Sequence, residues 1–206
     1  MTITQPRIYL ASQSPRRREL LKQIGVRFEL LLLRNDPRRQ IDVDEMELDN
    51  ETPEVYVERI CREKLVAAWK AVNLRNLPPF PVLAADTIVT VDGQIICKPR
   101  DNSHAEEILR SLSGRQHKVL TAIGVGFEDR FEYRVSTTTI TFTQLSDERI
   151  RRYLLTGEAH DKSGAYGIQG QAAAFIERIE GSHSGVVGLP LFETTEMLKS
   201  FGVLTP

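Results

Sequence analysis

Apolar residues along the chain alternate between short continuous runs and helical stripes. Residues 7–11 form a short apolar run, which predicts a buried strand. Leucine and isoleucine residues then recur at helical spacing over residues 15–24. Ser14 is a favourable N-cap for this helix, proline occupies its first position, and Gly25 suits its C-terminal end. The pattern therefore predicts a strand, a tight turn and a capped helix.

The same alternation continues to the end of the chain. An acidic stretch over residues 34–50 reads as a surface loop, and the Asp-Gly pair at 92–93 signals a hairpin. Strands and helices interleave through local hairpins and long crossovers, which predicts an α/β fold built on a mixed sheet flanked by helices. The expected helices cover residues 52–72, where Thr52 is the N-cap and proline lies in the first turn, 102–112 and 146–156, and a last one begins at Pro190. The expected strands cover residues 27–33, 81–91, 94–97, 117–127, 131–143 and 172–179.

Length and composition exclude several classes of protein. The 206 residues, 41% hydrophobic and 27% charged, predict one globular domain over residues 1–206. No apolar run approaches the ~20 residues of a membrane span, and the N-terminus lacks the regions of a signal peptide. Cys61 and Cys97 share no metal-binding spacing, so we expect a cytoplasmic protein without a disulfide framework. A formal net charge of −1 argues against nucleic acid and leaves small anionic ligands open.

The first candidate site is the turn between the first strand and helix, Ser-Gln-Ser-Pro-Arg-Arg-Arg at residues 12–18. Free N–H groups at the start of a helix, the hydroxyl of Ser12 and the guanidinium groups of Arg16 and Arg17 would together bind an anion. The alternative is a capped helix with a solvated basic first turn. Because cations in a first turn oppose the helix dipole, the three arginines favour an anion site.

Asp86 and Lys64 stand at positions that are otherwise apolar. Asp86 lies inside the run 82–91, where a carboxylate is costly unless it is paired, metal-bound or catalytic; a hydrogen-bonded aspartate at a turn is the plainer alternative. Thr87 either points to the opposite face or caps that turn. Lys64 falls within the apolar stripe of the helix over 52–72, and the helix alone favours a snorkelling side chain over a buried ion pair.

Three more residues are weaker candidates. Lys98 closes the hairpin that follows Asp86, so both could face one cleft. Glu45 belongs to the acidic loop, and such loops are usually only solvated, yet two carboxylates facing one cleft would suit Mg²⁺ or Mn²⁺. Gln169 lies in a glycine-rich turn, where its amide either pairs with a nucleobase edge or packs locally. Zinc-hydrolase, P-loop and serine-hydrolase motifs are absent from the sequence.

Taken together, these segments resemble the Maf family, nucleoside triphosphate pyrophosphatases once described as septum-formation inhibitors. The resemblance covers nearly the whole chain in order, and its motifs include Ala-Ala-Asp-Thr at 84–87 and Gly-Ala-Tyr-Gly-Ile-Gln-Gly at 164–170. The chain departs from the family pattern at residues 32–40, which read as an insertion, and at Gly185, where the family often has asparagine. The other matching segments are residues 10–21, Glu45, 62–64, 98–101, 112–115, 161–163, 179–181 and 186–191.

The resemblance implies a cytoplasmic homodimer with a Maf/ITPase-like α/β fold, two lobes and a deep cleft. It implies hydrolysis of the α–β phosphate bond of nucleoside triphosphates, assisted by a divalent cation (Mg, Mn or Co). Arg16, Thr87 and Gln169 match the subgroup that prefers dTTP and UTP, for which a house-cleaning role on modified pyrimidine nucleotides is one variant. The alternatives are a 7-methyl-GTP pyrophosphatase and a non-catalytic nucleotide-binding regulator of cell division.

These residues suggest how the reaction would proceed. A triphosphate carries about four negative charges, so catalysis must rest on positioning and charge neutralisation. We expect Arg16, Arg17, Lys64 and Lys98, with Ser12 and backbone amides, to hold the phosphate chain. Glu45 and Asp86 would bind the metal, and Asp86 would also accept a proton from the attacking water. Thr87 and Gln169 would read the O4/N3–H edge of the base.

Overall fold

A computed structural model describes residues 7–34 and 42–205, so residues 35–40 of the predicted insertion lie outside it, as do residues 1–6, 41 and 206. In this part of the chain, seven strands form one sheet in the order β2-β1-β3-β5-β6-β7, with β4 paired to β3. β1 runs parallel to β2 and β3, and the other pairs are antiparallel, which confirms the predicted mixed sheet. The strands are β1 (Ile8–Leu10), β2 (Phe28–Leu30), β3 (Val82–Val91), β4 (Gln94–Ile96), β5 (Gln116–Phe127), β6 (Arg130–Phe142) and β7 (Ile176–Glu180).

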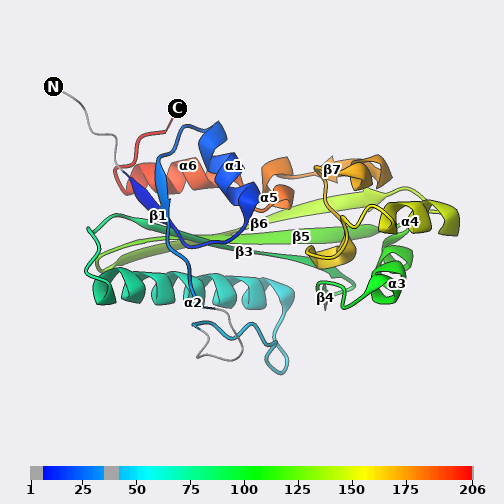
Figure 1. Cartoon of the computed structure of the whole chain (residues 1–206), viewed down its shortest axis with the longest axis horizontal. Helices are drawn as coiled ribbons and strands as arrows, with labels where there is room; N and C mark the ends of the chain where they lie inside the picture. The colour runs from blue at the N-terminus through cyan, green and yellow to red at the C-terminus, as the bar shows by residue number, and fades with distance from the viewer. Residues whose placement is uncertain (1–6, 35–41, 206) are drawn as a thin grey trace.

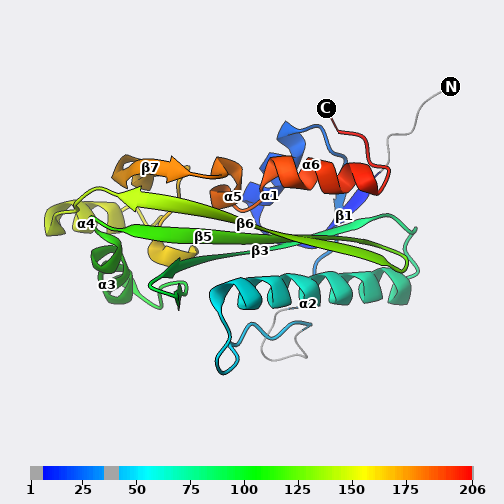
Figure 2. The same ribbon diagram turned by 180° about the vertical axis from the view of Figure 1, so that it is seen from behind.

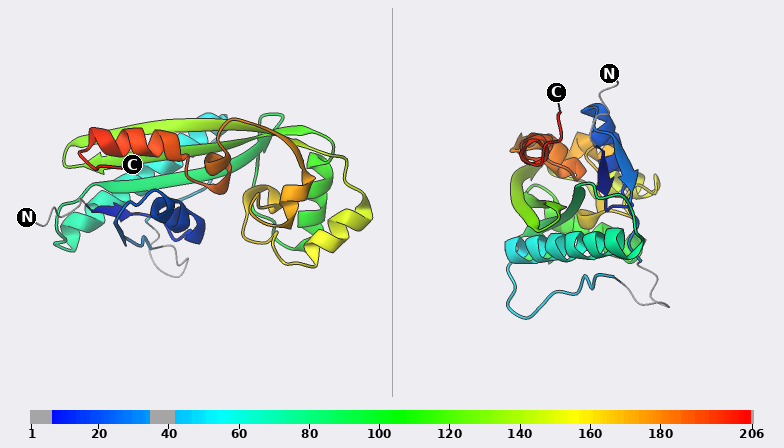
Figure 3. Two further views of the ribbon diagram at one scale, coloured as in Figure 1. Left: turned by 90° about the horizontal axis from the view of Figure 1, so that it is seen from above. Right: turned by 90° about the vertical axis from the view of Figure 1, so that its left-hand side faces the viewer.

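Helices cover both faces of this sheet. The long helix α2 lies along one face, whereas α1, α5 and α6 lie on the other (Figures 1 and 2), and the end-on view in Figure 3 shows the sheet between these layers. The predicted caps are present: Ser14 accepts a hydrogen bond from the backbone of Arg17 at the start of α1, and Thr52 accepts one from Val55 at the start of α2. The helices are α1 (Pro15–Gln23), α2 (Pro53–Leu74), α3 (Asn102–Leu112), α4 (Asp147–Leu154), α5 (His183–Val187) and α6 (Leu191–Ser200).

The central strand β3 contributes side chains to two hydrophobic clusters, one on each of its faces. Because side chains alternate along a strand, Val82 and Ala84 pack among residues of α2, while Leu83 and Ala85 pack with the cluster that includes residues of α1 and α6. Every apolar residue of β3 is less than a tenth exposed, as the near-continuous apolar run predicted. The interruption at residues 86–87 is also the part of β3 that is only partly buried.

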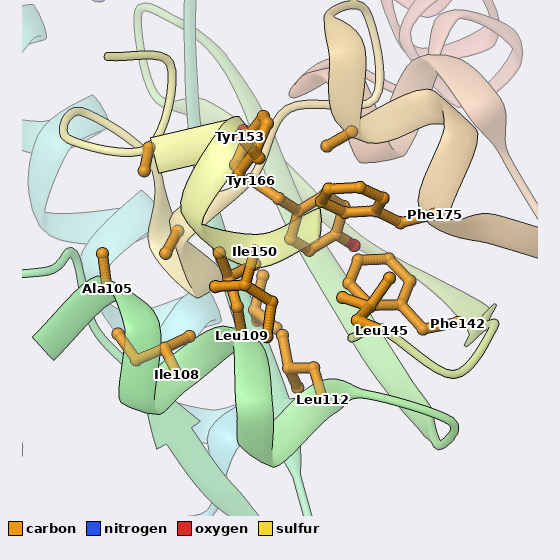
Figure 4. Packing of buried hydrophobic residues seen from close by; sticks show 14 of the residues in the cluster. Ala105, Ile108, Leu109, Leu112, Phe142, Leu145, Ile150, Tyr153, Tyr166 and Phe175 are labelled. Carbon is orange, nitrogen blue, oxygen red and sulfur yellow. The ribbon is translucent and has the colours of Figure 1, made fainter. Parts of the chain in front are cut away.

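A separate hydrophobic cluster fills the other end of the molecule. It joins α3 and α4 to the ends of β5 and β6, and Figure 4 shows Leu109, Ile150 and Phe175 among its members. Seen from above (Figure 3), this end is set apart along the long axis from the end that carries α1, α2 and α6. The deep cleft expected between two lobes stays a prediction.

Two local features differ from the sequence prediction. The strand expected over 172–179 begins only at Ile176, because Gln171–Phe175 forms the 3-10 helix η2, which turns the chain so that Ala172 and Phe175 are buried. The short helix α5 was not foreseen, since its five residues carry no helical period. It is held by the Ser182 side chain, which accepts a hydrogen bond from the Gly185 N–H, and it ends at Gly188 with φ 127°.

Candidate active site

Two carboxylates and one ammonium group meet between α2 and β3. The Nζ atom of Lys64 lies 2.7 Å from Oδ1 of Asp86 and 2.6 Å from Oε1 of Glu45. The side chains of Lys64 and Asp86 are only 18% and 13% exposed. Tyr56 of α2 donates a hydrogen bond to the backbone carbonyl of Glu45 (2.9 Å), which holds the acidic loop against the helix. Three residues that are far apart in the sequence therefore form one compact charged group.

The helix alone favoured a snorkelling Lys64, and that prediction was wrong. Burial acts to lower the pKa of Lys64, but the charges of Asp86 and Glu45 outweigh it, and the net effect raises the pKa above its ordinary 10.5. Lys64 is therefore a cation at neutral pH, and a proton acceptor at this site must be a carboxylate. The side chain was misjudged because its partner is on another element, which the helical period does not reveal.

Arg17 lies on the opposite face of β3 and is bound by protein atoms. Its Nε donates to the carbonyl of Gly188 (2.8 Å), and its Nη1 donates to the carbonyl of Ala85 (2.8 Å) and to Oγ of Ser12 (3.1 Å). Its Nη2 donates to Oγ1 of Thr87 (3.1 Å). These bonds engage four of the five N–H groups that an arginine carries. Arg17 thus joins α1, β3 and the end of α5 around two of the predicted substrate-binding residues.

The charged environment of Arg17 links the two faces of β3. Burial lowers the pKa of its guanidinium, and the nearby carboxylate of Asp86 opposes this effect. Asp86 and Thr87 are consecutive residues of a strand, so their side chains project to opposite faces. Asp86 accordingly contacts Lys64, and Thr87 contacts Arg17. Of the two roles left open for Thr87 by the sequence, the structure selects the opposite face.

The remaining predicted residues lie at the surface. Arg16 Nη1 is 3.6 Å from Oδ2 of Asp161, a contact between the first helix and the loop that leads to Gln169. Gln169 and Lys98 are exposed, and within residues 7–34 and 42–205 neither side chain has an assigned hydrogen bond or ion pair. Asp161 was not singled out in the sequence, although it lies in a segment that matched the family.

Glu45 and Asp86 carry the oxygen donors that a divalent cation prefers, and in this structure both carboxylates are paired with Lys64. In the described residues no group of three or more His, Cys, Asp or Glu side chains surrounds a common point. Glu45 and Asp86 nevertheless direct carboxylate oxygens to within 2.7 Å of one atom, Lys64 Nζ. Magnesium is commonly held by one or two carboxylates together with substrate phosphates and water, and such a donor set needs no third protein ligand.

This chain has relatives of similar length among known proteins. The chain is 54% identical to a Nitrosomonas europaea protein named "dTTP/UTP pyrophosphatase", with 95% of both chains covered. It is 53% identical to a protein of the same name from Aromatoleum aromaticum, with 96% of this chain and 97% of the other covered. A third, from Chromobacterium violaceum, is 45% identical with both chains covered fully.

The structure of the Staphylococcus aureus Ham1 protein aligns over 68% of this chain and 72% of its own, with a TM-score of 0.42 and 19% identity, a likeness too loose to carry an inference. None of the helices within residues 7–34 and 42–205 is both long and apolar enough to cross a bilayer. The model of the family described as Maf-like protein matches residues 7–201. With this match and relatives about half identical over nearly its whole length, the chain belongs to the Maf family.

Proposed function

We propose that this protein hydrolyses the α–β phosphate bond of dTTP and UTP, releasing the nucleoside monophosphate and pyrophosphate. The observation that carries the proposal is the group formed by Asp86, Lys64 and Glu45, in which Nζ of the lysine lies 2.7 Å from one acid and 2.6 Å from the other. The names of the 45–54% identical relatives support the substrate and the reaction. We also propose that the chain acts as one domain and as a cytoplasmic homodimer.

Cationic side chains neutralise the substrate. A triphosphate carries about four negative charges at neutral pH, and these repel an attacking water oxygen. Lys64, protonated and already close to two carboxylates, contacts the phosphate chain together with Arg16, Lys98 and the hydroxyl of Ser12. Arg17, with four N–H groups engaged by the protein, holds Ser12 and Thr87 in position and leaves one N–H for the nucleotide.

Asp86 accepts the proton from the attacking water. The water oxygen forms a bond to the α-phosphorus while the bond to the bridging oxygen breaks, and pyrophosphate leaves with that oxygen. Lys64 cannot take this proton because its pKa is raised. Its hydrogen bond to Oδ1 of Asp86 fixes the position of the carboxylate before the reaction begins.

Glu45 and Asp86 are the residues that would hold a divalent cation (Mg, Mn or Co). When bound, the cation supplies charge neutralisation on the phosphate oxygens. Glu45 is more than half exposed at its side chain, and its loop is tied to α2 through Tyr56. The carboxylate of Glu45 can therefore turn from Lys64 towards a ligand at little cost in packing.

The base is read by Thr87 and Gln169. Thr87 is partly exposed on the face of β3 that carries Arg17, and Gln169 is exposed in the loop that contains Asp161, the partner of Arg16. Pairing of these two side chains with the O4/N3–H edge of thymine or uracil gives the preference for dTTP and UTP over the other nucleotides.

A panel of nucleoside triphosphates tests the proposal. Canonical nucleotides, modified pyrimidine nucleotides and 7-methyl-GTP are each incubated with the protein and Mg²⁺ or Mn²⁺, and pyrophosphate release is followed. We expect dTTP and UTP, or their modified forms, to give the highest kcat/KM. A maximum at 7-methyl-GTP would assign the alternative activity, and binding without pyrophosphate release would indicate a non-catalytic regulator.

A further inference from the structure

The hydroxyl of Thr87 belongs to a row of hydrogen bonds that crosses two strands. Nη2 of Arg17 lies 3.1 Å from Oγ1 of Thr87, which lies 3.0 Å from Oγ1 of Thr121. Oγ1 of Thr121 in turn lies 2.8 Å from the carbonyl oxygen of Gly185 in α5. Thr87 and Thr121 are directly opposite each other in the antiparallel pair β3–β5, so the sheet register itself brings the two hydroxyls together.

The two ends of this row determine the direction of every bond in it. A guanidinium has only donors and a carbonyl oxygen has only lone pairs. The 2.8 Å contact with Gly185 therefore requires the hydroxyl proton of Thr121, because no other proton lies between those oxygen atoms. Thr121 then has no proton for Thr87, so Thr87 donates its own proton to Thr121 and accepts one from Arg17.

Thr87 is thereby left with one lone pair and no free proton. A hydroxyl has one donor and two acceptor positions, and the row occupies the donor and one acceptor. Thr87 is still accessible, since it is only partly buried whereas Thr121 is 1% exposed. Gly188 beside it has no side chain, and a Cβ there would come within 3.7 Å of the Thr87 hydroxyl. The open position at Thr87 can accept a hydrogen bond but cannot donate one.

We propose, on the basis of the proposed function, that Thr121 is a positioning residue for base selection. By taking the proton of Thr87, it makes that hydroxyl a pure acceptor, which pairs with the N3–H of uracil or thymine and is repelled by the unprotonated N3 of cytosine. The amide of Gln169 carries both a donor and acceptors and is exposed, so by rotation it fits either the O4 of uracil or the amino group of cytosine. Discrimination at the pyrimidine ring therefore falls to Thr87.

Replacement of Thr121 by valine tests this assignment. Thr121→Val keeps the shape of the side chain but removes its hydroxyl, so the proton of Thr87 becomes free to point at cytosine N3. We expect the ratio of kcat/KM for UTP to that for CTP to fall about tenfold or more, the size of an effect from one buried hydrogen bond. Thr121→Ser keeps the hydroxyl and should restore most of the ratio, which loss of packing alone would not do.

Thr138→Val is the matched control. Thr138 of β6 is equally buried, and its hydroxyl also contacts the region of α5, through the backbone of Ser182, but it has no contact with Thr87. We expect this variant to keep the wild-type ratio of UTP to CTP. A fall of the same size in both valine variants would overturn the proposal, because it would show that selectivity depends on the position of α5 and not on the proton of Thr87.

A measurement on the unaltered protein covers the case in which Thr121→Val does not fold. N3-methyl-UTP lacks the proton that Thr87 would accept, and we expect its kcat/KM to be at least about tenfold below that of UTP. Equal use of UTP and N3-methyl-UTP, or an unchanged ratio in folded Thr121→Val, would overturn the inference while leaving the proposed pyrophosphatase activity standing. Absence of pyrophosphate release from every nucleotide would overturn the proposed function itself.

Discussion

The carboxylate of Asp86 can be removed with almost no change of shape. In Asp86→Asn the side chain keeps its size, and its Oδ1 can still accept the hydrogen bond from Lys64 that is 2.7 Å long in the wild type. Lys64 also keeps Glu45 at 2.6 Å, so the ammonium group is not left without an anion. The substitution therefore removes one charge and one proton acceptor, and little else.

The magnitudes of the two effects differ widely. The ion pair becomes a hydrogen bond from the ammonium group to a neutral amide, which lowers the free energy of unfolding by about 1–3 kcal/mol and, for a chain of this size, the Tm by less than about 10 °C. Loss of a general base lowers kcat by about 10²–10⁴, and a weakened cation site adds to this loss. We expect turnover of UTP to fall about 10³-fold or more in a protein that remains folded at 25 °C.

Initial rates of pyrophosphate release, with UTP and Mn²⁺ both saturating, measure this effect, and thermal melting followed by circular dichroism confirms the folded state. Asp92→Asn is the matched control, because Asp92 also accepts a hydrogen bond from a cation, Arg115 (2.6 Å), yet is exposed at the hairpin after β3. We expect wild-type turnover in this control. Folded Asp86→Asn that turns over UTP within tenfold of the wild type would refute the reasoning.

Three further predictions follow from other parts of the structure. Burial lowers the pKa of His117 to about 4, so as the pH falls the unfolded chain takes up a proton on this imidazole before the folded chain does. The free energy of unfolding, measured with urea, should therefore fall by about 2 kcal/mol between pH 7 and pH 5, and His117→Gln should make this fall smaller. Gly188 has a φ of 127°, so Gly188→Ala should lower the free energy of unfolding by about 1–3 kcal/mol and raise the KM for UTP. Gly25→Ala, which is remote from the site, should leave the KM unchanged. Glu45→Gln should raise the Mn²⁺ concentration for half-maximal rate about tenfold, and Glu47→Gln should not.

Each of these three has a clear contrary outcome. A pH dependence of stability that is identical in the wild type and His117→Gln would show that the imidazole takes up its proton equally in both states. An unchanged KM in Gly188→Ala would show that the contact of Arg17 with the Gly188 carbonyl does not contribute to nucleotide binding. Equal metal requirements in the two glutamate variants would remove Glu45 from the proposed cation site.

The sequence was most informative where local chemistry sets local structure. The caps at Ser14 and Thr52, the hairpin at residues 92–93 and the mixed sheet were all predicted, because capping, turn formation and hydrophobic period depend on residues close together in the chain. Short elements such as α5 were missed because five residues are too few to show a hydrophobic period. The family was also recognisable from the sequence, since its motifs are strings of adjacent residues.

Contacts between distant residues were decided only by the tertiary structure. The sequence alone favoured a snorkelling Lys64, and only the packing of α2 on β3 showed the bonds to Asp86 and Glu45. Arg17 reads in the sequence as a phosphate ligand, yet four of its N–H groups bind protein atoms from three other segments. The partner of a side chain depends on the register and packing of whole elements. The free energy that favours one register and packing comes from contacts throughout the core, so no single sequence motif reveals it.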